Sequence, residues 1–369
     1  MKEKVLLLFI LATATMMGNT QTSSGILIDK QNQSTVIDSC DKKVSSLLTK
    51  LPNHSEIAIV LINKSNETFY GAKKKNNSIQ QVENSNRVFQ IGSISKVFTS
   101  TLLADLVNEE KLKLTDPVNK YLTVKKSKIK EIQLQQLANH TAGFPNMPNN
   151  LNLWSGVNPE KNYSKENLIE YLNKHFIPES KPGTAFAYSN VAVGILANVL
   201  SEAAKMDFEE LLQTKIFSKY GMNKSSSRCE KLGDRVTGLD AIGNAMPCYD
   251  LNALVGAGGI SSTVQDLTKF VKAQFDPSNK ELALTRKLTH ESNNTSIGLG
   301  WFIDSDSLKT TYTHNGAVGG FRSCMVFDTE NNYGVVVLSN IGVNNPNARE
   351  IDRLCYGLLS MLYKAENDN

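Results

Sequence analysis

Strand patterns in this chain occur near its two ends, and helical patterns fill the middle. Ile57-Ala58-Ile59-Val60-Leu61-Ile62 is a continuous apolar run rich in β-branched residues, which is typical of a buried strand. Four further strand patterns lie near the C-terminus, at residues 298–303, 311–314, 323–327 and 333–338. The simplest architecture for this order is α+β: an antiparallel sheet made by both ends of the chain, with the helical middle inserted as a second lobe.

The N-terminus has the form of a secretory signal peptide. Lys2 and Lys4 precede an apolar run, residues 5–17, that is too short for a comfortable membrane span. We predict a signal peptide over residues 1–19, a loose polar leader over 20–39 and one domain over 40–369, with its helical lobe at about 100–254. The protein would then be secreted or periplasmic, and it would contact a membrane only if the signal segment stays uncleaved.

The composition fits a soluble globular protein, with 40% apolar and 21% charged residues. A net charge of +4 on 369 residues is mild, and no basic stripe is interleaved with aromatic residues, so we predict no nucleic-acid partner. The chain has only five histidines, and no cysteine–histidine cluster has metal-ligand spacing. We therefore predict neither a metal site nor a cofactor.

Five cysteines follow the apolar N-terminal run, and an oxidising compartment would permit disulfides between them. Their odd number leaves at least one thiol unpaired within the chain. Cys229 with Cys248 is the most local pairing, whereas Cys40 with Cys355 would tie the two ends of the chain together. The sequence alone does not decide between these pairings.

Ser93-Ile94-Ser95-Lys96 opens a segment whose apolar residues recur at helical intervals. Positions three apart share one face of a helix, so the Ser93 hydroxyl and the Lys96 amine can meet within one turn. A serine hydroxyl becomes a good nucleophile when an adjacent base takes its proton, and a lysine is such a base if burial disfavours its charged form. The alternative is an N-capping serine followed by an ordinary lysine.

Tyr188-Ser189-Asn190 stands directly before a predicted apolar helix over residues 191–200. A helix entry is a rigid place from which to aim polar groups, although this pattern taken alone favours a core tyrosine beside an N-capping asparagine. His140 ends a predicted helix over residues 132–143. We expect His140 to be structural, because a helix end offers it carbonyl partners and no acid is near in sequence.

Three motifs, together and in this order, resemble the active-site motifs of the penicillin-recognising serine hydrolases. They are Ser93-Ile94-Ser95-Lys96, Tyr188-Ser189-Asn190 and His314-Asn315-Gly316. The nearest branch resembles the class C β-lactamases and the related D-alanyl-D-alanine carboxypeptidases and esterases. Four further stretches support the resemblance, which runs from about residue 40 to 363: Asn139-His140-Thr141-Ala142-Gly143, Lys181-Pro182-Gly183-Thr184, Gly258-Gly259-Ile260-Ser261-Ser262 and Gly298-Leu299-Gly300-Trp301.

The resemblance implies a β-lactamase/transpeptidase-like fold, in which helices flank an antiparallel sheet and an all-helical lobe is inserted. It also implies catalytic roles for three residues. Ser93 would attack the carbonyl and form an acyl-enzyme, while Lys96 and Tyr188 would share the proton transfers. A tyrosine with an unperturbed pKa of ~10 is a poor base at neutral pH, so we expect a cationic Lys96 to help it act.

The same resemblance implies the residues that bind substrate. Asn190 would orient Lys96 and the substrate amide, and the backbone N–H groups of Ser93 and Ala317 would form the oxyanion hole. His314, Asn315 and Gly316 would complete the substrate site.

One departure from the resemblance concerns His314. Most β-lactamases of this group have Lys-Thr-Gly where this chain has His314-Asn315-Gly316. A histidine with a reference pKa of ~6.5 is mostly neutral at pH 7, so the substrate carboxylate would lack its usual partner. We hypothesise that carboxylate-bearing substrates bind better below the histidine pKa. Arg322 could supply the missing charge, but we interpret it as an exposed residue at a strand end.

The resemblance implies that the protein is a secreted serine hydrolase that acts on the amide bonds of β-lactams or D-alanyl peptides. The alternatives are an esterase or amidase with the same catalytic residues, and a low-turnover penicillin-binding protein. We expect a monomer whose partner is a small-molecule or peptide substrate.

Overall fold

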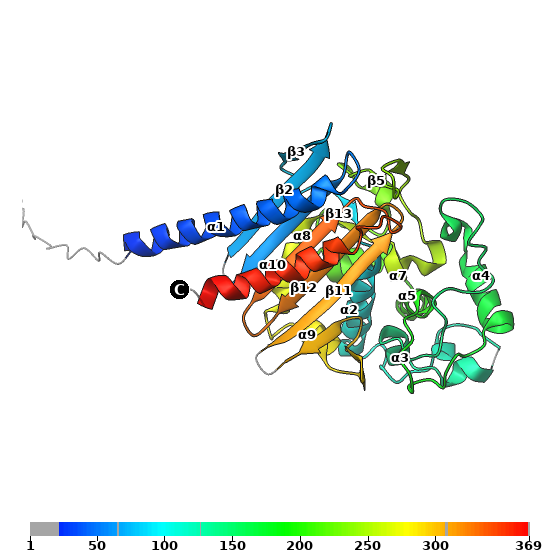
Figure 1. The fold of residues 1–369 in the computed structure, drawn as a ribbon. Helices are drawn as coiled ribbons and strands as arrows, with labels where there is room; N and C mark the ends of the chain where they lie inside the picture. Colours follow the sequence, from blue (N-terminus) through cyan, green and yellow to red (C-terminus); the bar gives the residue numbers. More distant parts are fainter. Residues whose placement is uncertain (1–21, 65, 126, 307–308, 368–369) are drawn as a thin grey trace, which may run out of the picture.

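A nine-stranded antiparallel sheet forms the centre of the computed structural model, which describes residues 22–64, 66–125, 127–306 and 309–367 (Figure 1). The strand order is β3-β2-β1-β13-β12-β11-β10-β9-β8. The strand bounds are β1 Glu56–Asn63, β2 Asn66–Lys75, β3 Ser78–Gln81, β8 His290–Ser292, β9 Thr295–Ile297, β10 Phe302–Ser305, β11 Thr310–Val318, β12 Phe321–Asp328 and β13 Tyr333–Ser339.

The N-terminal and C-terminal strands lie together in this sheet, as predicted. Strand β1 pairs with β13 over seven residues, from Ile57 opposite Ser339 to Asn63 opposite Tyr333. The α+β fold with one sheet made from both ends of the chain is therefore confirmed.

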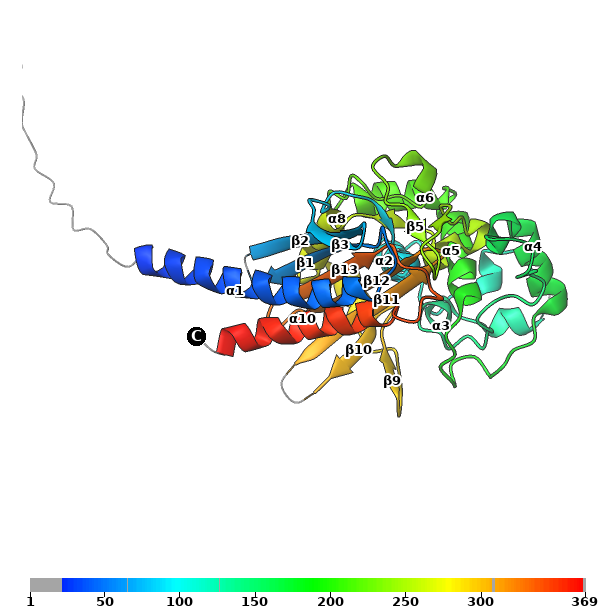
Figure 2. The same cartoon turned by 45° about the horizontal axis from the view of Figure 1, so that its top comes forward.

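The apolar run of β1 is buried on both faces of the sheet, which explains why it is continuous rather than alternating. Ala58, Val60 and Ile62 belong to one hydrophobic core, and the alternate residues belong to the other. Two long helices, α1 Thr22–Thr49 and α10 Glu350–Asn367, lie side by side over one face (Figures 1 and 2).

The opposite face of the sheet packs against α2 Ser95–Asn108 and α8 Val264–Gln274, beyond which the helical middle of the chain extends (Figure 1). The other helices are α3 Leu134–Ala138, α4 Lys165–Glu170, α5 Asn190–Ala204, α6 Phe208–Leu212, α7 Val255–Gly258 and α9 Lys280–Arg286. Two short ladders complete the strands: β4 Phe89–Gln90 with β7 Ser261–Ser262, and β5 Gly238–Leu239 with β6 Ala245–Met246.

Two predictions, one of a helix and one of a loose leader, differ from the structure. The helix predicted over residues 132–143 is only α3, because the Asn139 side chain accepts hydrogen bonds from the Thr141 backbone N–H and hydroxyl and so replaces the helical pattern. The first helix, α1, begins at Thr22 and so includes most of the predicted leader. The predicted signal peptide lies outside the described residues. Within the described ranges, no helix is long and apolar enough to cross a membrane.

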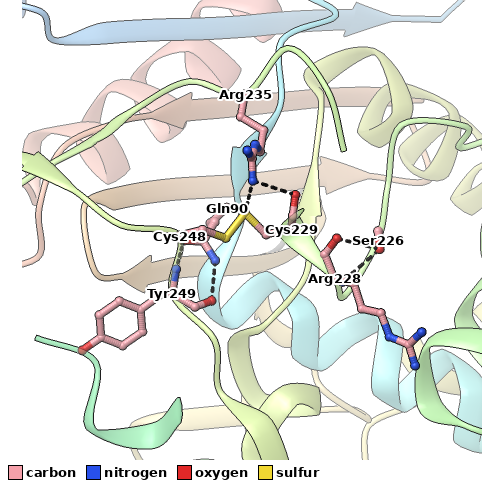
Figure 3. The surroundings of a disulfide bond; sticks show 7 residues. All are labelled: Gln90, Ser226, Arg228, Cys229, Arg235, Cys248 and Tyr249. Atoms are coloured by element: carbon pink, nitrogen blue, oxygen red, sulfur yellow. Dashed lines mark hydrogen bonds between the residues drawn. A yellow bond between two sulfur atoms is a disulfide. The ribbon is translucent and has the colours of Figure 1, made fainter. Parts of the chain in front are cut away.

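Cys229 and Cys248 form a disulfide, the most local of the pairings considered. Cys40, Cys324 and Cys355 are free thiols buried in the core under α1 and α10, so the alternative pairing of Cys40 with Cys355 is not formed. The disulfide closes a loop that is held close to β4 (Figure 3).

We predict that Ile59→Ala lowers the free energy of unfolding by about 2–5 kcal/mol, because it empties a fully buried position between the sheet and its covering helices. Urea denaturation measures the effect. The matched control is Ile177→Ala at a side chain that is 72% exposed, where we expect a change within about 0.5 kcal/mol. Equal decreases in the free energy of unfolding of the two variants would contradict this prediction.

Candidate active site

Ser93 lies in a single 3₁₀ turn, Gly92–Ile94, that leads directly into α2. This local structure places Lys96 one turn after Ser93, and the Lys96 Nζ is 3.0 Å from the Ser93 Oγ. The predicted meeting of hydroxyl and amine is therefore present. Lys96 is fully buried, whereas Ser93 is partly exposed.

The turn before Ser93 packs directly against strand β11, which requires two glycines. Gly92 has φ of +51°, a conformation that side chains disfavour. A Cβ on Gly316 would lie 2.0 Å from the Ile91 carbonyl oxygen, so a side chain there would displace the turn. The Ser323 hydroxyl donates a hydrogen bond to the same carbonyl at 2.8 Å and thereby joins the turn to β12.

Lys96 Nζ has two acceptors besides Ser93. The Ala257 carbonyl oxygen is 2.6 Å away and the Asn190 Oδ1 is 2.7 Å away. A neutral amine has two N–H groups and one lone pair, so donating to both acceptors leaves the lone pair for the Ser93 hydroxyl. Burial lowers the Lys96 pKa well below its ordinary value, which favours this neutral form.

Asn190 can reach Lys96 because Ser189, rather than Asn190, caps α5. The Ser189 hydroxyl accepts a hydrogen bond from the Ala192 backbone N–H at 3.0 Å. Asn190 is then the first helical residue, and its Nδ2 donates to the Asn146 Oδ1 at 2.9 Å. Its amide oxygen thus points at Lys96, and the alternative of an N-capping asparagine is wrong.

Tyr188 completes the group around Ser93. Lys96 Nζ is 4.9 Å from the centroid of its ring. Burial raises the Tyr188 pKa to about 12, although the nearby Ser93 hydroxyl opposes that shift. Tyr188 is consequently a phenol at neutral pH. For both Lys96 and Tyr188, burial shifts the pKa in the direction that favours the neutral form.

His314 lies on β11 with its ring centroid 6.4 Å from that of Tyr188. Its Nδ1 is 2.6 Å from the Asn315 carbonyl oxygen, so Nδ1 carries the proton and Nε2 is an acceptor. The His314 pKa is lowered to about 3, mainly by burial and secondly by the neighbouring Lys96. The sequence-based pH hypothesis therefore no longer applies near neutrality, because His314 is uncharged throughout that range.

Asn315 and Arg322 point away from this group of residues. Asn315 Nδ2 donates a hydrogen bond to Asp352 of α10 at 3.3 Å, on the other face of the sheet. The Arg322 guanidinium forms an ion pair with the same carboxylate, with Nε 3.1 Å from Oδ1. Arg322 is only 16% exposed, and its charge is already neutralised, so the structure does not offer it to a substrate carboxylate.

Sequence reasoning missed two contributors to the site. The Ala257 carbonyl has no side-chain signature, although the glycine-rich stretch after it was recognised. Gly256 lets α7 approach α5, since a Cβ there would lie 2.5 Å from the Ala197 Cβ. The second contributor is His140, whose ring centroid is 4.5 Å from that of Tyr188.

A cavity of about 240 Å³ lies elsewhere, beside the disulfide, and Ser93 does not line it. Gln90 on β4 connects the two places: it exchanges two hydrogen bonds of 2.8 Å with the backbone of Tyr249, next to Cys248 (Figure 3). Within the part of the chain that the structure describes, no group of three or more His, Cys, Asp or Glu residues could hold a metal ion.

A partly exposed serine whose hydroxyl faces a buried lysine amine is the arrangement of a serine hydrolase with lysine as its base. A family model described as Beta-lactamase matches residues 53–355, and the chain belongs to that family. The resemblance inferred from the three motifs is thus confirmed.

Individual relatives agree with this assignment. A β-lactamase of Pseudomonas fluorescens is 26% identical over 346 residues, which cover 83% of this chain and 92% of the relative. The D-alanyl-D-alanine-carboxypeptidase/endopeptidase AmpH of Escherichia coli K12 is 25% identical over 318 residues, covering 76% and 78%. The crystal structure of a β-lactamase/D-alanine carboxypeptidase from Pseudomonas syringae shares the fold, with a TM-score of 0.75, 22% identity and 89% and 98% coverage.

The protein is accordingly a serine hydrolase of the β-lactamase or D-alanyl-D-alanine-carboxypeptidase type.

We predict that Lys96→Arg slows acylation by a fluorescent penicillin roughly 10²- to 10⁴-fold, because a guanidinium stays protonated and cannot accept the Ser93 proton. In the parent protein kcat/KM should fall as pH falls through the lowered Lys96 pKa, since the amine must be neutral to act. The control is Lys113→Arg at an exposed lysine. If both variants label at the same rate, Lys96 is not the base.

Proposed function

We propose that the protein hydrolyses acyl substrates through an acyl-enzyme on Ser93, with Lys96 as the base that activates it. The observation that carries this proposal is the contact set of Lys96 Nζ, which lies 3.0 Å from the Ser93 Oγ while the Asn190 Oδ1 and the Ala257 carbonyl oxygen accept hydrogen bonds from it. A binding protein without turnover has no need for a base prepared in this way.

In acylation, the Ser93 Oγ forms a bond to the substrate carbonyl carbon while its proton passes to Lys96 Nζ. Tyr188, as a phenol, donates its proton to the leaving nitrogen as the bond from carbon to that nitrogen breaks. The Lys96 ammonium then returns a proton to the Tyr188 oxygen. In deacylation, the same groups take a proton from the attacking water and return it to the Ser93 oxygen.

The negative charge that develops on the carbonyl oxygen would be stabilised by the backbone N–H groups of Ser93 and Ala317. The close packing of the Ser93 turn on β11 supports this pair, because a Cβ on Gly92 would lie only 2.6 Å from the Ala317 nitrogen. The side chains of Asn190 and His314 would contact the substrate. Gly316 would contribute only its backbone, and the Asn315 side chain would not touch the substrate, because it is hydrogen-bonded to Asp352.

A second substrate class, acyl esters or amides without a carboxylate, is favoured by the charges around the site. His314 is neutral, burial disfavours the charged form of Lys96, and the Arg322 guanidinium is paired with Asp352. A carboxylate-bearing substrate would therefore find no unpaired cation among these groups. The same catalytic residues would serve such an esterase or amidase.

We also propose that residues 1–19 direct export and that the mature chain acts outside the cytoplasm as a monomer. The disulfide between Cys229 and Cys248 supports this location, because disulfides persist in oxidising compartments. Mass spectrometry of the exported protein tests the proposal. A mature chain that still begins at Met1 would contradict removal of the signal peptide.

We predict that Ser93→Ala abolishes covalent labelling by a fluorescent penicillin and hydrolysis of every substrate that the parent enzyme turns over. A panel of nitrocefin, a D-alanyl-D-alanine peptide and a short-chain nitrophenyl ester would define the substrate class. Rapid nitrocefin turnover indicates a β-lactamase, whereas stable labelling with peptide cleavage indicates a carboxypeptidase. Hydrolysis that persists in Ser93→Ala would refute the acyl-enzyme mechanism.

We predict that His314→Lys raises kcat/KM for a carboxylate-bearing substrate relative to a neutral ester by about tenfold, the effect of a charged hydrogen bond worth about 1.4 kcal/mol. Expressing the result as a ratio within one preparation cancels any loss of folded protein. Arg322→Lys is the control, because that charge stays beside Asp352. An unchanged ratio in His314→Lys would show that the missing cation does not control selectivity.

A further inference from the structure

We propose that His140 is a positioning residue that holds Tyr188 against Ser93, and not merely a structural residue at a helix end. This inference rests on the role of Tyr188 proposed above. It comes from a motif, Asn139-His140-Thr141-Ala142-Gly143, whose role the mechanism leaves unexplained.

The backbone of His140 contacts the residue before Tyr188. The chain turns sharply after α3, with His140 at φ of +60°, and the turn presents the His140 carbonyl oxygen to the 187–189 segment. That oxygen accepts a hydrogen bond from the Ala187 backbone N–H at 2.8 Å. A turn of this kind is uncommon for a residue with a side chain, although histidine is among the residues that adopt it more often.

The ring of His140 contacts the next two residues. Its plane lies 37° from that of the Tyr188 ring, with the centroids 4.5 Å apart. Its Nδ1 accepts a hydrogen bond from the Ser189 backbone N–H at 3.2 Å. One side chain with its own carbonyl therefore fixes three consecutive residues, and the catalytic tyrosine is the middle one.

This set of contacts requires a neutral imidazole with its proton on Nε2. Nδ1 accepts the Ser189 N–H, so it cannot carry a proton itself. Burial is the largest cause that holds the His140 pKa well below its usual value, and Lys96 and His314 add to it. The Nε2 atom is buried and has no hydrogen-bond partner among the described residues. A buried N–H without a partner costs free energy, so a histidine at this position is favoured only if the contact of Nδ1 with Ser189 is needed.

The requirement for His140 follows from what Tyr188 must do. A proton relay works only if the phenol oxygen stays within hydrogen-bond distance of its partners, and displacement by about 1 Å can cost about 100-fold in rate. The ring of Tyr188 is fixed from one side by His140, while Ser189 is fixed by its cap on α5 and by its donation to the Pro145 carbonyl oxygen at 2.6 Å.

The test separates the ring contact from the backbone contacts. His140→Asn keeps an acceptor near the place of Nδ1 and tolerates the left-handed turn, but it removes the ring that packs on Tyr188. We expect a cooperative thermal transition, a fall in kcat of about tenfold to 100-fold and a KM changed less than about threefold. His54→Asn is the matched control, because His54 has φ of +68° and is exposed.

A double-mutant cycle with Tyr188→Phe decides whether His140 acts through the phenol. Removing the hydroxyl should make His140→Asn nearly without effect, at less than about threefold in kcat/KM. Equal losses in the two backgrounds would overturn the proposal, as would an unchanged kcat in His140→Asn alone. The reaction measured must be one that Ser93→Ala abolishes. If Ser93→Ala leaves it intact, the Ser93 mechanism fails independently of the role of His140.

A spectroscopic measurement on the parent protein gives a second test. Nitrogen-15 NMR of histidine-labelled protein should show one ring with an unprotonated Nδ1 and a protonated Nε2 that does not titrate between about pH 5 and pH 8. The ring signal that is missing from the spectrum of His140→Asn is assigned to His140. A protonated Nδ1, or titration in this range, would contradict the role of His140.

Discussion

The buried amine of Lys96 is the group on which the catalytic half of the structure depends. Its acceptors come from elements that are far apart in the sequence, Asn190 at the start of α5 and the Ala257 carbonyl of α7. The Thr99 hydroxyl also donates to the Gly256 carbonyl oxygen at 2.8 Å, which joins α2 to α7 a second time. Since an unpaired buried N–H is costly, satisfying Lys96 fixes three helices relative to one another.

Burial is the largest cause of the pKa shifts in the centre around Ser93. It lowers the pKa of Lys96, His140 and His314 and raises the pKa of Tyr188, so each group is shifted toward its uncharged form. In the mechanism that we propose, charge develops as the Ser93 proton moves and an oxyanion forms. The backbone N–H groups that we propose for the oxyanion hole would stabilise that charge without having to reorganise.

The sequence predicted the sheet and the catalytic contacts because both depend on short-range patterns. The apolar run of β1 and the spacing of Ser93 from Lys96 each follow from the period of one element. The length of α3 was not predictable in this way, because Asn139 replaces helical hydrogen bonds with its own side chain. The cap of α5 was assigned to the wrong neighbour, since Ser189 and Asn190 are both good caps and only their partners in space distinguish them.

The pairing of β1 with β13 has a consequence for how the protein reaches its active form. Helix α2, which directly follows the turn of Ser93, packs on a sheet in which β1, from near the N-terminus, lies beside β13, from near the C-terminus. A ribosome must therefore release residue 339 before the scaffold beneath the nucleophile can close. Contacts between segments so far apart in the sequence form slowly, so the pairing that completes this scaffold is a slow step of folding.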